Sequence, residues 1–223
     1  MQIATMFPVP VMGGKNREGV FIMLEPKEGL LTFRAEGNNI TGSGYYSRKL
    51  HWPGAVSKCN AYGSGVTLGR GYDMKHRSTG EIIADLTLAG VSLNEAKKLA
   101  GGAHKSHCAA SDFVRNNKGS TIELTEQQQL RLFEHVYAMY VKDSIRFYNK
   151  YKQQGSVSWS ELHKVLKEVL IDMRFQGALR HEMISVFGKN QKQDVIRLIN
   201  GNAFLANYES ARGRVRYIQE CMR

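Results

Sequence analysis

The 223-residue sequence has no long apolar run and few prolines or cysteines. Its hydrophobic stretches are too short to cross a bilayer, so we expect no transmembrane segment. The apolar stretch near the amino terminus has no basic segment ahead of it, and Pro8 and Pro10 interrupt it, so we expect no secretory signal peptide. If the protein acts outside the cytoplasm, it must be exported by a route other than its own signal peptide.

Cysteine is scarce, and its pattern excludes several kinds of site. Cys59, Cys108 and Cys221 form no C-x-x-C motif, and an odd number argues against a full disulfide framework. Ordinary thiols of a reducing cytosol are the simpler interpretation, and a single bridge formed after export is the alternative. His104, His107 and Cys108 are loosely spaced for zinc and lack a fourth ligand, so we predict no metal site. Without a P-loop or a G-x-S-x-G elbow, no cofactor is expected either.

Basic residues are in clear excess. Lys and Arg number 31 against 20 acidic residues, which gives a net charge of +11 and a pI near 9.6. Such a chain should gather near polyanions, namely nucleic acid, anionic lipid or the bacterial cell wall. The sequence shows no helix-turn-helix, zinc-finger or aromatic RNA-binding pattern, so it does not support specific nucleic-acid binding.

The amino-terminal part of the sequence is rich in turn formers. From about residue 32 to 80, short β-formers alternate with Gly, Ser and Asn, which favours hairpins. The preceding stretch, residues 19–31, resembles a short helix that ends near Gly29, although Pro26 would disturb its hydrogen bonds.

From residue 85 onward the pattern is helical. Capping boxes at Ser92–Glu95, Thr125–Gln128 and Ser158–Glu161 each predict a helix start, and residues 191–200 and 209–222 fit two more helices. We therefore predict an α+β fold with a small β-hairpin lobe at about 30–80 and a larger, mainly α-helical lobe at about 85–223. A cleft between the lobes would be the natural ligand site.

Glu28 is the first candidate for chemistry. It lies between apolar segments, and a glutamate that its neighbours partly desolvate suits a general acid at neutral pH. A solvated carboxylate at a helix end is the plainer alternative, because most glutamates are surface residues.

The second candidate is the glycine-rich segment GSGVTLGRGYDM, residues 63–74. Thr67 and Asp73 are six residues apart, so on an undistorted strand they would share a face. A hydroxyl and a carboxylate that converge can hold and deprotonate a water molecule. The alternative is a glycine-rich turn in which Asp73 caps the following segment.

Several motifs, in order along the chain, resemble phage lysozymes and pesticin-like muramidases. VFIMLEPKEGL resembles the opening that leads to a catalytic Glu-Gly-Leu, and VTLGRGYDM resembles the hairpin of these enzymes. HWPGAVS with SGVTLGRGYDM is closer to the pesticin-like group. LKEVLIDMRFQGAL resembles the core helix with its Phe-Gln-Gly turn, and DVIRLINGNAFLANYESARGRVRYI the closing helices.

The resemblance implies a lysozyme-like domain over residues 19–223 after an extension at 1–18. It makes Glu28 the general acid, Thr67 the residue that positions the attacking water, and Asp73 the second carboxylate. Glu36 is the rival second carboxylate, because it is the only acidic residue between Glu28 and Asp73. A threonine that holds water favours inversion, which needs carboxyl groups roughly 6.5–9.5 Å apart.

The resemblance also implies how the sugar is held. The predicted substrate-binding residues are Gln176, Trp52 and Tyr72, with Tyr45, Tyr46 and Tyr62 as further aromatics that could stack on sugar rings. The cluster Arg212, Arg214 and Arg216 could attract wall polymers or form a solvated helix face. The segment 57–63 resembles an insertion that could reshape the rim of the cleft.

The implied activity is hydrolysis of the β-1,4 bond between N-acetylmuramic acid and N-acetylglucosamine in bacterial peptidoglycan. We expect a monomer made in the cytoplasm without a leader, acting in a target cell's periplasm as an injected antibacterial effector with a cognate immunity protein, or as a phage endolysin. The rival functions are a non-catalytic wall- or chitin-binding protein on the same fold, a basic nucleic-acid-binding protein, and the same chemistry on chitin or chitosan.

Overall fold

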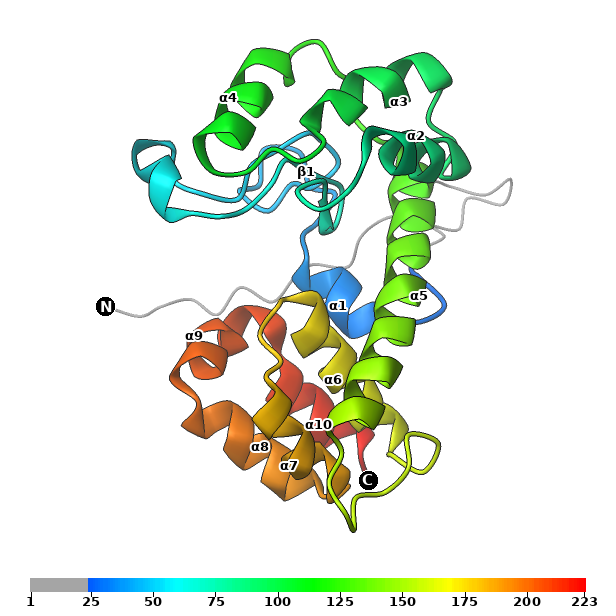
Figure 1. The fold of residues 1–223 in the computed structure, drawn as a ribbon, viewed down its shortest axis with the longest axis vertical. Coiled ribbons are helices and arrows are strands. Elements are labelled where there is room, and N and C mark those ends of the chain that lie inside the picture. Colours follow the sequence, from blue (N-terminus) through cyan, green and yellow to red (C-terminus); the bar gives the residue numbers. More distant parts are fainter. Residues whose placement is uncertain (1–23) are drawn as a thin grey trace. The chain divides into compact units, whose positions relative to one another are not determined.

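The computed structural model describes residues 24–223, and the chain divides into two compact units (Figure 1). The first unit comprises Glu36–His135 and the described residues before Lys27, and the second comprises Lys27–Ala35 and Val136–Arg223. The predicted extension at 1–18 and the start of the predicted helix at 19–23 lie outside the described residues.

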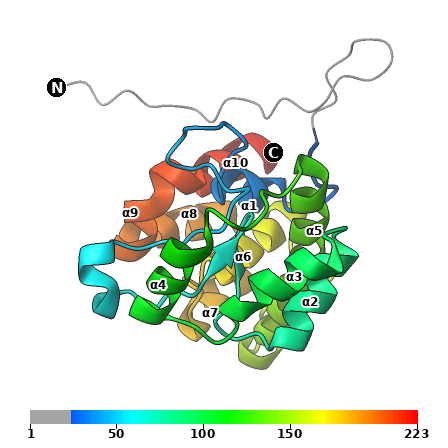
Figure 2. The same ribbon diagram turned by 90° about the horizontal axis from the view of Figure 1, so that it is seen from above.

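The first unit combines short helices with the hairpin. Its core gathers around fully buried apolar residues such as Leu68, Met74 and Leu99. The helices α2 and α3, which lie side by side, cover part of this core (Figure 2). The elements are η1 (Val56–Ala61), β1 (Thr67–Leu68), β2 (Tyr72–Asp73), α2 (Thr79–Leu88), α3 (Leu93–Leu99), η2 (Ala100–Gly102), α4 (His107–Asn117) and the start of α5 (Glu126–Tyr151).

Side-chain caps begin several of these helices. Ser92 accepts a hydrogen bond from the Glu95 backbone N–H at the start of α3, as predicted. Thr125 and Gln128 exchange reciprocal side-chain-to-backbone hydrogen bonds at the start of α5, which confirms the second predicted capping box. These contacts are local in sequence, which is why the pattern predicted them.

The second unit is helical throughout its named elements. Buried residues of α5, α6, α7, α8 and α10, such as Tyr148, Leu170, Phe187, Ile199 and Ile218, form one hydrophobic core. The elements are α1 (Leu30–Ala35), the remainder of α5, α6 (Lys164–Phe175), η3 (His181–Met183), α7 (Ile184–Gly188), α8 (Lys192–Gly201), α9 (Ala203–Arg212) and α10 (Arg214–Cys221).

Two helix predictions in this unit are wrong in detail. Ser158 and Glu161 do form a reciprocal box, but it closes a turn, and α6 begins only at Lys164 after the cap His163. The predicted helix at 209–222 is broken, because Gly213 adopts a left-handed φ of 66° that ends α9 before α10 starts.

The broad α+β class agrees with the structure, since the described residues are mostly helical and contain a two-stranded antiparallel sheet. The β content is smaller than predicted, because the Gly- and Asn-rich stretch favours turns and leaves isolated bridges beside one short hairpin. The predicted lobe boundary near 80–85 also differs from the division into units, because α2, α3 and α4 belong with the hairpin.

Among the described helices, none is both long enough and apolar enough to span a membrane.

A buried charge network links α6 with the turn between α9 and α10. Asp172 is fully buried, and it accepts hydrogen bonds from Arg214 Nε at 2.6 Å and Arg212 Nη1 at 2.8 Å. Arg214 is also fully buried and donates from Nη2 to Gln176 Oε1 at 2.6 Å. A buried charge needs such partners, because its loss of hydration is otherwise uncompensated.

We expect Asp172→Asn to lower the free energy of unfolding by about 3–5 kcal/mol, since it leaves buried guanidinium charge uncompensated. Denaturant unfolding of the variant measures this loss. Asp112→Asn is the control, because its ion pair with Arg115 is exposed and such pairs contribute about 0–1 kcal/mol. Equal losses in both variants would contradict the assignment of Asp172 as the centre of the network.

Candidate functional site

The hairpin of β1 and β2 brings the two predicted water-holding residues together. Its register pairs Thr67 with Asp73 and Leu68 with Tyr72. The Met74 N–H donates to the Val66 carbonyl at 2.9 Å, so the adjoining Thr67–Asp73 pair is of the non-hydrogen-bonded kind. Side chains approach each other most closely in such pairs. Thr67 and Asp73 therefore project from the same face of the hairpin, as the sequence predicted.

The opposite face of the hairpin belongs to the hydrophobic core. Side chains alternate between the faces of a strand, and the residues that flank Thr67 and Asp73 are almost completely buried. These core residues are Val66, Leu68, Tyr72 and Met74, each at most 1% exposed. Their burial fixes which face carries Thr67 and Asp73.

The hairpin turn depends on two glycines and a buried arginine. Gly69 and Gly71 have φ values of 59° and 80°, which L side chains rarely adopt. Arg70 between them is 2% exposed. Burial lowers the pKa of the Arg70 guanidinium to about 10, against the opposing effect of the carboxylates of Glu126, Glu36 and Glu25.

The two candidates for the second carboxylate, Glu36 and Asp73, have different neighbours in the hairpin. Glu36 interacts electrostatically with Arg70, at the turn of the hairpin. Asp73 directly opposes Thr67 across the strands. Of the two carboxylates, Asp73 is thus the one that lies opposite Thr67 in the hairpin.

Backbone N–H groups hold the Asp73 carboxylate in place. Gly65 N–H donates to Oδ2 at 3.1 Å, and Lys75 N–H donates to Oδ1 at 2.7 Å. The close approach needs a glycine at 65, because a Cβ there would overlap Asp73 Oδ1 and lie 2.8 Å from the Lys75 nitrogen. The carboxylate is thus a fixed acceptor and also caps the following segment, which was the alternative interpretation of Asp73.

The Thr67 hydroxyl has a defined orientation. Its Oγ1 donates to the Gly65 carbonyl at 3.2 Å, and the residue is 5% exposed. With the hydroxyl hydrogen directed at Gly65, the oxygen keeps its lone pairs for another donor.

Sequence reasoning missed His51 at this face. His51 and Thr67 exchange two backbone hydrogen bonds of 2.9 Å as an antiparallel bridge, so His51 lies across from Thr67 on the side away from Asp73. The HWPG motif, which contains His51 and Trp52, was the signal in the sequence that could have pointed to this histidine. Spacing along the chain does not reveal that His51 pairs with Thr67.

Glu28 belongs to the second unit, whereas Thr67 and Asp73 belong to the first. It lies in a bend ahead of α1, so the predicted helix ending near Gly29 is wrong over residues 24–29. Pro26 disfavours a helix there, and Gly29, with φ of 75°, accepts the first hydrogen bond of α1 from Phe33 N–H.

The surroundings of Glu28 also differ from the expectation. Glu28 is exposed, whereas the sequence suggested a carboxylate partly desolvated by apolar neighbours. Next to it, Gly29 packs closely against the ring of Tyr137. Burial raises the pKa of Tyr137, and the negative charges of Glu168, Asp172 and Glu28 raise it further.

Two of the predicted sugar contacts have structural roles. Tyr72, predicted to bind substrate, is 1% exposed and donates from its hydroxyl to Asp85 Oδ2 at 2.8 Å. Its side chain lies on the core face because it alternates with Asp73 along β2. Gln176 caps the end of α6, and its amide oxygen accepts from Arg214.

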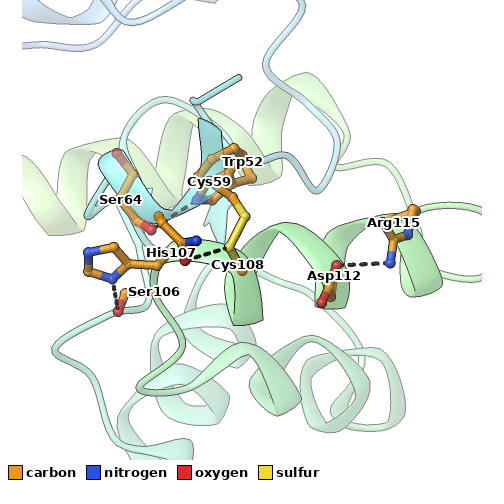
Figure 3. The surroundings of a disulfide bond; sticks show 9 residues. Trp52, Cys59, Ser64, Ser106, His107, Cys108, Asp112 and Arg115 are labelled. Atoms are coloured by element: carbon orange, nitrogen blue, oxygen red, sulfur yellow. Dashed lines mark hydrogen bonds and ion pairs between the residues drawn. A yellow bond between two sulfur atoms is a disulfide. The ribbon is translucent and has the colours of Figure 1, made fainter. Parts of the chain in front are cut away.

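Trp52 and Tyr62, two of the predicted sugar-stacking aromatics, lie in the part of the first unit that contains a disulfide bond. Cys59 of η1 and Cys108 of α4 are bonded, so the simpler prediction of free thiols is wrong for this pair (Figure 3). Trp52 donates from its indole N–H to the Ser64 carbonyl at 3.0 Å, and its ring meets Tyr62 edge-on at 6.2 Å. The predicted insertion at 57–63 is thus largely a 3₁₀ helix tied to α4.

The structure also places the other predicted aromatic residues, Tyr45 and Tyr46, and the predicted arginine cluster. Tyr46 is buried and donates to Glu123 Oε2 at 2.6 Å, while Tyr45 is 73% exposed. Of the cluster that was predicted either to attract wall polymers or to form a solvated helix face, Arg214 is buried in the Asp172 network, whereas Arg216 is exposed. Within residues 24–223, no group of three or more His, Cys, Asp or Glu side chains is placed to hold a metal ion.

Gly65→Ala tests the support of Asp73. The added methyl group should displace the carboxylate and cost about 1–3 kcal/mol of unfolding free energy, as overpacking does. Thermal or denaturant unfolding measures the loss. Gly80→Ala is the matched control, because a Cβ there meets open space within α2 and should stabilise the helix by about 1 kcal/mol. A Gly65→Ala variant as stable as wild type would contradict the packing described.

The disulfide closes a loop with a sequence separation of 49. We expect Cys59→Ser with Cys108→Ser to lower the free energy of unfolding by about 2–4 kcal/mol, because the unfolded chain regains entropy. Denaturant unfolding without reductant measures the difference. Cys221→Ser is the control, because Cys221 is exposed and outside the bond, and it should leave stability unchanged. Equal stability of the double variant and wild type would refute the bond's contribution.

Comparison with curated proteins gives no match. Residues 29–214 match a protein family, and the matched segment includes His51, Thr67, Asp73 and both bonded cysteines but begins directly after Glu28. Because this match covers most of the chain, the protein belongs to the family described as Domain of unknown function (DUF8812).

Proposed function

We propose that this protein is a lysozyme-like muramidase that hydrolyses the β-1,4 bond between N-acetylmuramic acid and N-acetylglucosamine of bacterial peptidoglycan. The observation that carries the proposal is the hairpin pairing of Thr67 with Asp73 on the face away from the core. A fixed hydroxyl and a fixed carboxylate side by side can orient a water molecule for attack.

In the proposed reaction Glu28 is the general acid. It donates its proton to the glycosidic oxygen as the bond to the sugar carbon breaks. Its exposure leaves the carboxyl accessible to a polymer substrate. Thr67 and Asp73 serve the attacking water, and direct attack by water inverts the configuration at the anomeric carbon.

The surface of the first unit offers groups suited to a sugar polymer. Tyr62 is 43% exposed and meets the half-buried Trp52, and aromatic rings of this kind stack on sugar faces. The net charge of +11 would favour approach to an anionic wall. Both features are compatible with peptidoglycan as the substrate.

The disulfide supports action outside a reducing cytosol, because such bonds persist in oxidising compartments such as the bacterial periplasm. We therefore propose a bacteriolytic role in the wall of a target cell. The protein would be delivered as an antibacterial effector with a cognate immunity protein, or released as a phage endolysin.

Digestion of purified peptidoglycan by wild type and Glu28→Gln, with mass spectrometry of the released fragments, tests the proposal. We expect reducing muramic-acid ends from wild type and a loss of at least about 10²-fold in the variant, since it lacks the acid. Lys27→Gln, an exposed neighbour in the same bend, is the matched control and should digest like wild type.

Other products identify other functions. Anhydro ends would indicate a lytic transglycosylase, and release from chitin alone would change the substrate. Binding of both proteins to the wall without any release would contradict the enzyme and leave a wall-binding module.

A further inference from the structure

His51, Thr67 and Asp73 form a row across three adjacent backbone segments. Thr67 is the middle member, paired with His51 on one side and with Asp73 on the other. Directly opposed residues of antiparallel segments project from the same face. An imidazole therefore joins the hydroxyl and the carboxylate on the face that points away from the core.

The hydrogen bonding of the imidazole defines which nitrogen is basic. His51 Nδ1 lies 2.9 Å from the carbonyl oxygen of Lys49. A carbonyl oxygen can only accept, so Nδ1 carries the hydrogen and donates it. In the neutral ring the lone pair is then on Nε2, which can take up a proton.

The charges around the imidazole act in opposite directions. Burial lowers the pKa of His51, and the ammonium of Lys49 lowers it further. The hydrogen bond to the Lys49 carbonyl and the carboxylate of Asp73 raise the pKa, because both favour the imidazolium. The net effect lowers the pKa of His51, which favours the neutral ring, while the charge of Asp73 favours the imidazolium.

Asp73 is placed to supply that charge. Each of its oxygens already accepts a backbone N–H, from Gly65 and from Lys75. These two bonds hold the carboxylate as a fixed negative charge within electrostatic reach of His51. With Nδ1 bonded to the Lys49 carbonyl, Nε2 is the nitrogen of the neutral ring that can accept a proton.

We propose that His51 Nε2 is the base that accepts the proton of the attacking water, while Thr67 orients that water and Asp73 stabilises the imidazolium. This inference rests on the proposed glycoside hydrolysis and assigns its base. His51 is thus a catalytic residue, and Asp73 acts through it.

The step conserves atoms and charge. Water donates one hydrogen bond to Thr67 Oγ1 and the other to His51 Nε2, and its oxygen attacks the anomeric carbon. The carbon–oxygen bond to the leaving sugar breaks, and the leaving oxygen takes the proton of Glu28. His51 gains the water's proton, and it later releases a proton to solvent while Glu28 takes one up.

The kinetic test uses His51→Asn, whose side-chain amide can still donate to the Lys49 carbonyl but has no titratable nitrogen. We expect kcat/KM for soluble muropeptide oligomers to fall by about 10²–10⁴-fold, the usual contribution of a general base. In wild type, activity should be lost as the pH falls through the pKa of His51, and the variant should lack this limb. His51→Gln serves as a second variant, and a thermal melt of each reports its folding.

His76→Gln is the matched control, because His76 is an exposed histidine of the same unit. It should keep the rate and pH profile of wild type. His51 variants that fold and retain the wild-type kcat/KM and acid limb would overturn the assignment. If wild type releases no reducing ends, or if Glu28→Gln digests like wild type, the proposed function itself fails and this assignment fails with it.

NMR titration of the histidine ring protons gives a readout independent of turnover. We expect the pKa of His51 to lie below its ordinary value and to fall further in Asp73→Asn, because the variant removes the charge that favours the imidazolium. An unchanged His51 pKa in Asp73→Asn would contradict the pairing of the two groups.

Discussion

The register of one short hairpin decides which side chains meet on the polar face of the first unit. A slip of one residue would turn Thr67 and Asp73 toward the core and send Leu68 and Tyr72 out. Burial of the apolar residues opposes that slip, and so do the left-handed glycines of the turn. The polar face is therefore specified by the hydrophobic face behind it.

The second unit depends on a different constraint, the neutralisation of Asp172. Two arginines, which Gly213 separates along the chain, reach the same buried carboxylate because the left-handed glycine redirects the chain between α9 and α10. In a continuous helix Arg212 and Arg214, two residues apart, would not point toward the same carboxylate. The break in the helix therefore allows both arginines to neutralise the buried Asp172. The same arrangement places Arg214 where it donates a hydrogen bond to Gln176.

Sequence reasoning succeeded where the deciding contacts are local. The caps at Ser92 and Thr125 and the alternation at Thr67 and Asp73 involve residues a few positions apart, so spacing reveals them. It failed where distant parts of the chain decide. The pairing of His51 with Thr67 and the bond of Cys59 to Cys108 depend on tertiary structure, and the Ser158 box forms without starting a helix.

The bond between Cys59 and Cys108 also determines what happens when a protease cleaves the chain between them. Both hairpin strands, with Thr67 and Asp73, lie between the bonded cysteines in sequence. A single cut in the exposed parts of that segment would therefore leave the two pieces covalently joined. The pieces of a nicked chain thus stay joined without relying on packing alone, whereas those of an unbonded chain are held only by noncovalent contacts. Cross-linking of this kind extends the working life of a protein in surroundings where peptide bonds are attacked.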